Sequence, residues 1–295
     1  MHVLPGLGSA FDGPYNYVPS RVVAIIMISF FGVSTMWHIG SAVYRKMWWL
    51  FPTVVLCGVM EVLGWSARLW SHSEPLNDVP FQIQIVSTIL APTPLLAATF
   101  VIFGEIIRRT GQIYSRLSPR SYTILFCTAD VVSLVVQGVG GGLAATADPR
   151  TNGRSPETGG RVMLGGIAFQ LAVMVVFCIC GAEFIVRYVK DLPLRAVETV
   201  DSQDSLVLSK RGELTKKLKV MLCALTFSTI VLFIRAVYRL IELADGWNGR
   251  IISTEVYFNV LDGAMVVLAI YTLNFVHPGY FVYKPESARR DEEKA

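Results

Sequence analysis

The chain has 295 residues, of which 53% are hydrophobic and only 16% are Asp, Glu, Lys or Arg. Soluble domains average about 25% charged residues, so this sequence lacks the charge that an ordinary water-exposed surface needs. Together with a mean hydropathy of +0.51, the composition excludes a disordered chain, a collagen-like chain and a small disulfide-stapled secreted domain. A protein that crosses a membrane several times remains.

Seven apolar stretches are long enough to cross a bilayer, because a hydrocarbon core of about 30 Å needs about 20 helical residues. None of them alternates polar and apolar residues as a barrel strand does, so we expect an all-α, seven-transmembrane helix bundle. The bundle, at 18–279, is expected between tails at 1–17 and 280–295. The predicted spans are 18–43, 47–70, 81–107, 121–146, 161–187, 219–242 and 254–277.

The basic residues predict the orientation of the bundle. Eighteen of the 26 Lys and Arg residues fall in the loops after the first, third and fifth spans and in the C-terminal tail. Basic residues collect on the cytoplasmic side, so we expect an extracellular N-terminus and a cytoplasmic C-terminus. The long connection 188–217 is then a cytoplasmic loop that rests its basic end on anionic lipids, or a regulatory loop phosphorylated at Ser202, Ser205 or Ser209.

Polar residues recur seven apart within four of the spans, which places each pair on one helix face. The pairs are Glu61 and Arg68, Asp130 and Gln137, Arg235 and Glu242, and Glu255 and Asp262. An ionised group in a span has to be paired or to line an aqueous cavity. We therefore expect polar stripes that face the bundle interior.

These residues divide into two layers by depth. The outer half holds Glu61, Arg235, Arg239 and Asp262, with Arg68, Glu242 and Glu255 nearer the surface. Two arginines one turn apart repel each other, so we expect carboxylates of neighbouring helices beside them. Structural ion pairing and a polar cavity for the head group of an amphipathic ligand both explain this layer.

The inner layer has carboxylates but no intramembrane cations. Asp130, Glu105 and Glu183 fall in the inner half, with Gln137 and Gln170 near the middle. We expect these three carboxylates to be protonated or reached by water.

Helix breakers mark the third, fourth and fifth spans. Pro92 and Pro94 interrupt the third span near its middle, which frees backbone carbonyls and bends a helix. Gly140 and Gly141 belong to a glycine run in the fourth span, and Gly165 lies in the fifth. Small residues allow close helix packing, and broken helices also build transporter binding sites.

Motifs of enzymes, metal sites and cofactor sites are missing from the sequence. His38 and His277 lie near spans but in no HExxH arrangement, and no GxSxG turn or glycine-rich phosphate loop occurs. We therefore predict no catalytic residue, no metal and no cofactor.

The polar motifs, in their order and spacing from Val33 to Gly279, resemble the fungal RTA-like proteins, also called lipid-translocating exporters. The matching motifs are Glu61-x-x-Gly64-Trp65-x-x-Arg68, Gln84 with Leu90-Ala91-Pro92, Asp130-x-x-Ser133-x-x-x-Gln137-x-x-Gly140-Gly141-Gly142, Gly165-Gly166 with Gln170, Arg235-x-x-Tyr238-Arg239-x-x-Glu242, Gly246, Glu255, Asp262 and His277-Pro278-Gly279. The resemblance implies export or transbilayer movement of sphingoid bases, sterol-like amines or lipophilic toxins.

Two functions remain open from the sequence. The first is a transporter for cationic amphipaths without ATP chemistry of its own, and the second is a seven-helix lipid or stress sensor that signals through its cytoplasmic loops. We expect residence in the plasma membrane, with another endomembrane as the alternative. Membrane lipids and an amphipathic small molecule are the expected partners, with no nucleic acid, and the oligomeric state is left open. The candidate substrate-binding or transport residues are Glu61, Arg68, Asp130, Gln137, Gln170, Arg235, Arg239, Glu242, Glu255 and Asp262, with Pro92, Pro94, Gly140 and Gly141 for helix breaks or packing.

Overall fold

The computed structural model describes residues 13–147, 155–194, 212–247 and 249–283. Most of the two predicted tails and the serines at 202, 205 and 209 lie outside these ranges. The described residues form helices and no strand. Seven of the helical spans are long and apolar enough to cross a membrane, so the protein is an all-helical, multi-pass membrane bundle.

Four of the seven spans are single uninterrupted helices and three are composite. The single ones are α1 (Arg21–Tyr44), α5 (Pro119–Ala145), α6 (Pro156–Lys190) and α8 (Lys216–Asp245). The second span begins with a short 3₁₀ turn and a π-helical segment η2 (Phe51–Val55) and continues as α2 (Leu56–Ser73). The third consists of α3 (Asp78–Leu90) and α4 (Pro92–Thr110), and the seventh of α9 (Glu255–Phe258), the π-helical η4 (Asn259–Ala264), α10 (Met265–Phe275) and α11 (Pro278–Phe281).

Several helices begin where a hydroxyl or amide side chain precedes the span. Ser118 and Ser155 each accept a backbone N–H of the first turn, and proline follows each of them at the first helical position. Asn77 and Thr215 cap α3 and α8 in the same way. These caps satisfy backbone groups that would otherwise lack partners, so local sequence fixes where these helices start.

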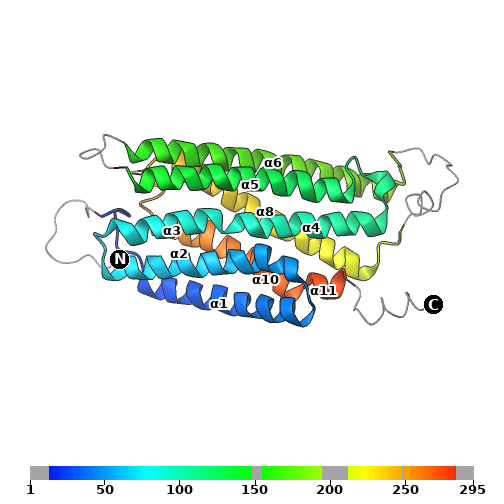
Figure 1. Ribbon diagram of the computed structural model, residues 1–295, viewed down its shortest axis with the longest axis horizontal. Coiled ribbons are helices and arrows are strands. Elements are labelled where there is room, and N and C mark those ends of the chain that lie inside the picture. The colour runs from blue at the N-terminus through cyan, green and yellow to red at the C-terminus, as the bar shows by residue number, and fades with distance from the viewer. Residues whose placement is uncertain (1–12, 148–154, 195–211, 248, 284–295) are drawn as a thin grey trace.

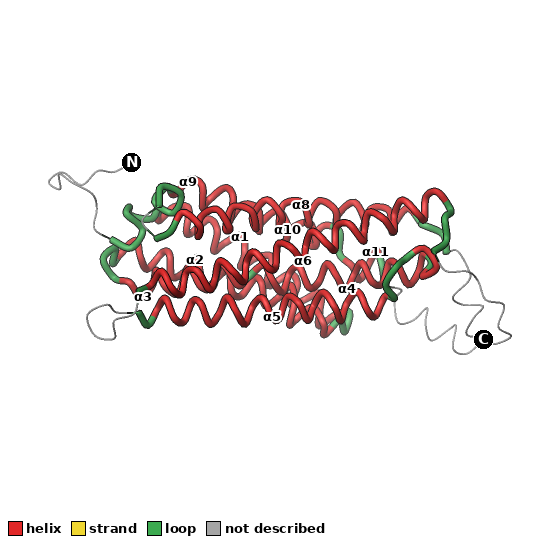
Figure 2. The backbone as a smooth tube through the Cα atoms, turned by 90° about the horizontal axis from the view of Figure 1, so that it is seen from above, coloured by secondary structure: helices red, strands yellow, loops and turns green. Residues whose placement is uncertain are grey.

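The third span lies in the centre of the bundle. It has 78% of its most apolar window buried, against 28% for α1 at the edge. In Figure 1, α3 and α4 lie end to end between the α5–α6 pair and α2. The loops gather at the two ends of the elongated bundle, as Figure 2 shows. We call the end with the N-termini of α1, α3, α6 and α9 the amino-terminal end, and the opposite one the carboxyl-terminal end.

Close packing of α5 against α6 depends on glycines. A Cβ atom on Gly140 would lie 2.6 Å from the backbone nitrogen of Met163, and one on Gly159 would lie 2.3 Å from that of Ala144. Gly141 faces α3 instead, where a Cβ would lie 2.9 Å from Val86. The helix axes therefore approach more closely than any side chain would allow.

Candidate functional site

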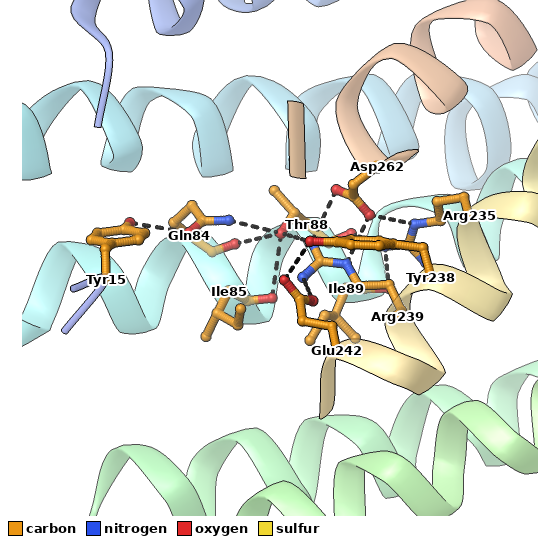
Figure 3. Close-up of polar contacts among 10 residues, drawn as sticks. All are labelled: Tyr15, Gln84, Ile85, Thr88, Ile89, Arg235, Tyr238, Arg239, Glu242 and Asp262. Carbon is orange, nitrogen blue, oxygen red and sulfur yellow. Dashed lines mark hydrogen bonds and ion pairs between the residues drawn. The ribbon is translucent and has the colours of Figure 1, made fainter. Parts of the chain in front are cut away.

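A cluster of charged side chains lies between α8, α2 and the seventh span. We call Glu61, Arg235, Arg239, Glu242 and Asp262 the ionic core; each has at most 4% of its surface exposed. Arg235 Nε donates to Asp262 Oδ1 at 2.8 Å, and Arg239 Nε donates to the same oxygen at 2.7 Å. Arg239 Nη2 also reaches Asp262 Oδ2 at 2.9 Å. One carboxylate thus binds two guanidinium groups one turn apart, as expected from the sequence (Figure 3).

Asp262 lies on the π-helical segment η4 rather than on a regular α-helix. A π-helical turn is rare and changes the direction of the side chains that follow it. Gly263 also lets Trp65 of α2 pack against this turn, since a Cβ there would lie 2.5 Å from the indole ring. The local backbone therefore holds Asp262 between α2 and α8.

The break between α3 and α4 supplies a backbone acceptor to the ionic core. Arg235 Nη2 donates to the carbonyl oxygen of Thr88 at 2.5 Å. In a regular helix the N–H of residue 92 would bond that carbonyl, but Pro92 has no N–H. The sequence predicted that proline would free carbonyls here, and one of them binds an arginine.

Polar side chains extend from the ionic core towards the amino-terminal end. Arg239 Nη2 donates to the hydroxyl of Thr88 at 2.7 Å, and the amide of Gln84 donates to the same hydroxyl at 3.2 Å. Tyr15 then donates to Gln84 Oε1 at 3.0 Å, which completes the chain of contacts in Figure 3. Burial raises the pKa of Tyr15 to about 12, so its hydroxyl remains a donor at neutral pH.

Glu242 is held within α8. Its two oxygens accept from Arg239 Nη1 and from the Tyr238 hydroxyl, each at 2.7 Å. Both contacts join residues three or four apart, which lie on one helix face.

Arg68 and Glu255 form a second ion pair nearer the amino-terminal end. Arg68 Nη2 lies 3.2 Å from Glu255 Oε1 and donates to the hydroxyl of Tyr17 at 2.7 Å. The ring of Phe258 lies 4.6 Å from the Arg68 guanidinium and 5.0 Å from that of Arg239. One aromatic ring therefore contacts the cations of both groups.

Two buried carboxylates have no well-aligned hydrogen-bond donor among the described residues. Glu61 is fully buried and interacts with Asp262, Arg235, Arg239 and the indole N–H of Trp65, yet no donor is well aligned with either of its oxygens. Asp130 on α5 is also buried, and both of its oxygens lack a donor. Buried polar groups are normally hydrogen-bonded, so both positions need an explanation.

Amide side chains form a separate group on the other side of the α3–α4 break. Gln137 Nε2 donates to Ser133 Oγ at 2.9 Å and to Gln170 Oε1 at 3.0 Å. Gln170 Nε2 donates in turn to the hydroxyl of Thr93 at 3.0 Å. The first turn of α4 is thus in contact with the amide group through Thr93, and the last turn of α3 is in contact with the ionic core through Thr88.

The expectation that the inner carboxylates lack cationic partners is wrong for two of the three. Glu105 pairs with Arg108 and Arg109 at 2.8 and 2.7 Å. Glu183 pairs with Arg187 at 2.8 Å and with Arg116 at 2.5 Å. These arginines lie at helix ends or in a connection, and their long side chains reach back to the carboxylates. Asp130 alone of the three has no cation beside it in the part of the chain that the structure describes.

The sequence missed several residues of the site. Thr88, Tyr15, Tyr17 and Phe258 all contact it, and none was a candidate. Thr88 could have been found, because it lies four residues before Pro92 and therefore carries the freed carbonyl. Tyr15 and Tyr17 gave no such signal, since they precede the first helix.

Comparison with known proteins places the chain in a family. A family model described as RTA1 like protein matches residues 54–285. The chain is 33% identical to the sphingoid long-chain base transporter RSB1 of Saccharomyces cerevisiae, over 97% of this chain and 79% of the relative. From the same organism, it is 29% identical to protein RTM1, over 72% of this chain and 62% of RTM1. Protoporphyrin uptake protein 1 is 25% identical, over 87% of this chain and 89% of the relative. No solved structure matches. The chain belongs to the RTA1-like protein family.

Proposed function

We propose that this protein moves cationic amphipaths of the sphingoid-base type across the membrane. We further propose that it resides in the plasma membrane, with its N-terminus outside and its C-terminus in the cytosol. The family membership and the transporter named among its relatives support a lipid-related transport role. We propose no enzymatic activity for it.

The unpaired carboxylate of Glu61 carries this proposal. The ionic core contains three carboxylates and two guanidinium groups, and the hydrogen bonds to arginine go to Asp262 and Glu242. Glu61 is left without one. Without Glu61, the two carboxylates and two guanidinium groups of the ionic core balance in charge. Glu61 therefore leaves one negative charge, and a protonated long-chain amine carries one positive charge together with an apolar tail.

Trp65 adds a hydrogen-bond donor one turn along α2. Its indole N–H is buried, interacts with the Glu61 carboxylate and has no well-aligned acceptor among the described residues. A sphingoid base has hydroxyl groups next to its amine, so the amine would pair with Glu61 while a hydroxyl accepts from Trp65. The same head group would then satisfy both side chains.

Entry of such a ligand requires the helices to move. The helices around Glu61 are tightly packed. A Cβ atom added to Gly58 would lie 2.0 Å from the Thr35 side chain, and one added to Gly263 would lie 2.5 Å from that of Trp65. The α3–α4 break offers a hinge, because proline has removed a helical hydrogen bond there. We propose that α3 and α4 change their relative tilt to open the ionic core.

The distribution of basic residues over the two ends of the bundle supports the proposed orientation. At the carboxyl-terminal end the described residues carry Arg45, Lys46, Arg108, Arg109, Arg116, Arg120, Arg187, Lys190, Lys216, Lys217 and Lys219. Far fewer basic residues lie at the amino-terminal end, and this asymmetry supports a cytoplasmic carboxyl-terminal end.

Purified protein in liposomes tests the proposal. Fluorescently labelled sphingosine is added, and its movement between leaflets is followed by quenching of the label in the outer leaflet. We expect flux with the wild type and its loss with Glu61→Gln, while Glu183→Gln, which removes a carboxylate at the carboxyl-terminal end, retains it. Flux of Glu61→Gln equal to that of the wild type would remove Glu61 from the site. A folded wild type without flux would contradict transport and favour the sensor.

A further inference from the structure

A cavity of about 250 Å³ lies at the amino-terminal end of the bundle, apart from the ionic core. Its walls come from α3, α5 and α6, from residues 13–16 ahead of the first helix, and from Trp247 after α8. Ligand pockets usually measure about 300–1,000 Å³. This cavity is therefore sized for a head group and the first part of a chain rather than for a whole long-chain lipid.

Small residues of α5 leave the cavity open. Gly141, Ala144 and Ala145 line one side, where larger side chains would fill the space. Opposite them, Phe81 of α3 meets the ring of Trp247 edge-on with centroids 6.0 Å apart. Trp247 is fixed by its indole N–H, which donates to the carbonyl of Pro156 at 3.2 Å. The cavity thus has two positioned aromatic rings in its wall.

The described residues that line the cavity include one charged side chain, the carboxylate of Asp78. This residue is exposed and has no ion-pair partner among the described residues. Asp78 occupies the first turn of α3. A carboxylate beside two aromatic rings, with no cation in the lining, is complementary to an organic ammonium group.

The deeper wall is apolar. Ile85 and Val86 lie about two turns along α3 from Asp78, and Met163 of α6 lines the cavity with them. A ligand that places its ammonium group at Asp78 would therefore lay its first methylene groups against these side chains. Both requirements are met by an amine with an aliphatic chain.

We propose that this cavity binds the ammonium head group of a cationic amphipath at Asp78, Phe81 and Trp247, as a second site distinct from Glu61. The inference rests on the proposed function for its ligand class. Phe81 also packs edge-on against Tyr15, with ring centroids 4.7 Å apart. Tyr15 donates a hydrogen bond to Gln84, and Gln84 donates to Thr88, which contacts the ionic core. The cavity is thus separated from the ionic core by Tyr15 and Gln84.

Equilibrium binding of radiolabelled dodecylamine to the full chain in nanodiscs tests the site, with empty nanodiscs as the background. The measurement uses the Glu61→Gln protein, so that the proposed core site has lost its carboxylate. We expect Asp78→Asn to weaken binding about twofold to fivefold, because a charge pair at an exposed site is lost and only the aromatic and apolar contacts remain. Ala145→Phe, which fills the cavity, should weaken it similarly.

Two controls make the result specific. Glu74→Gln removes a nearby carboxylate that does not line the cavity and instead accepts from Asn77 at 2.8 Å, and it should bind as the parent protein does. Dodecanoate, of the same length but opposite charge, should not compete. Unchanged binding in both Asp78→Asn and Ala145→Phe would overturn the site. Amine binding that depends on Asp78, together with a wild-type protein that shows no lipid flux in liposomes, would keep this site and reject the proposed transport.

Discussion

The guanidinium group of Arg235 takes the hydrogen-bonding position that Pro92 leaves empty on the Thr88 carbonyl. The donor and the oxygen are 2.5 Å apart, and Arg235 binds Asp262 at the same time. A residue of α8 is thereby attached to the central broken helix through its backbone. The helix break and the buried cation each satisfy a polar group of the other.

Pro92→Ala tests whether the helix break at this position acts as a hinge. Alanine restores an N–H that competes with Arg235 for the Thr88 carbonyl. We therefore expect a stiffer third span, unchanged or higher thermal stability in detergent, and slower flux in liposomes. Pro52→Ala, in the second span and away from the ionic core, is the matched control. Flux unchanged by Pro92→Ala would show that the break is not a hinge.

The pairing of Arg235 with Asp262 can be measured by a double-mutant cycle. Arg235→Gln and Asp262→Asn should each lower the free energy of unfolding by about 3 to 5 kcal/mol, because each leaves a buried charge without its partner. The double mutant should recover part of that loss, and Arg239 limits the recovery since it also binds Asp262. Thermal unfolding in detergent gives the three values. Strictly additive losses would mean that the two residues do not interact.

Glu61→Gln should not lower stability, in contrast to Arg235→Gln and Asp262→Asn. Glu61 has no hydrogen-bonded arginine, so its neutral isostere removes a buried charge without leaving another one unpaired. We expect the protein to keep or gain about 1 kcal/mol in stability while it loses flux. A large loss of stability in the same unfolding assay would instead identify Glu61 as a structural ion-pair member.

Tyr15→Phe should change stability at alkaline pH. Burial raises the pKa of Tyr15 to about 12 in the folded protein, while an unfolded tyrosine ionises near 10. The folded state then holds the proton more tightly, so stability is unaffected by this group below pH 10 and falls as the pH rises from 10 to about 12. Tyr15→Phe removes part of that fall. Tyr44→Phe, at an exposed position, should leave the alkaline profile unchanged.

Topology gives an independent prediction. A tag placed after Ala295 should be protected from protease in intact cells, because the carboxyl-terminal end carries most of the basic residues. A tag placed before Met1 should be cleaved under the same conditions. Cleavage of the C-terminal tag in intact cells would reverse the proposed orientation.

The helices were predictable from the sequence, and much of the ionic core was too, because both leave local signals. Apolar length gave the seven spans, the Ser-Pro pairs mark the starts of α5 and α6, and the seven-residue spacing identified Arg235 and Asp262. Side-chain partners from distant segments left no such signal. The pairing of Glu183 with Arg116 depends on how a connection folds back on α6, and the insertion of Tyr15 beside Gln84 depends on the path of the chain ahead of α1.

The break between α3 and α4 at Ala91 is attached on both sides. Thr88, in the last turn of α3, holds two arginines of α8, and Thr93, in the first turn of α4, holds the amide of Gln170 on α6. A change in tilt between α3 and α4 would therefore strain contacts with α8 and with α6 at the same time. If the third span opens as proposed, both sets of hydrogen bonds have to break together, so we expect the movement to be cooperative rather than gradual.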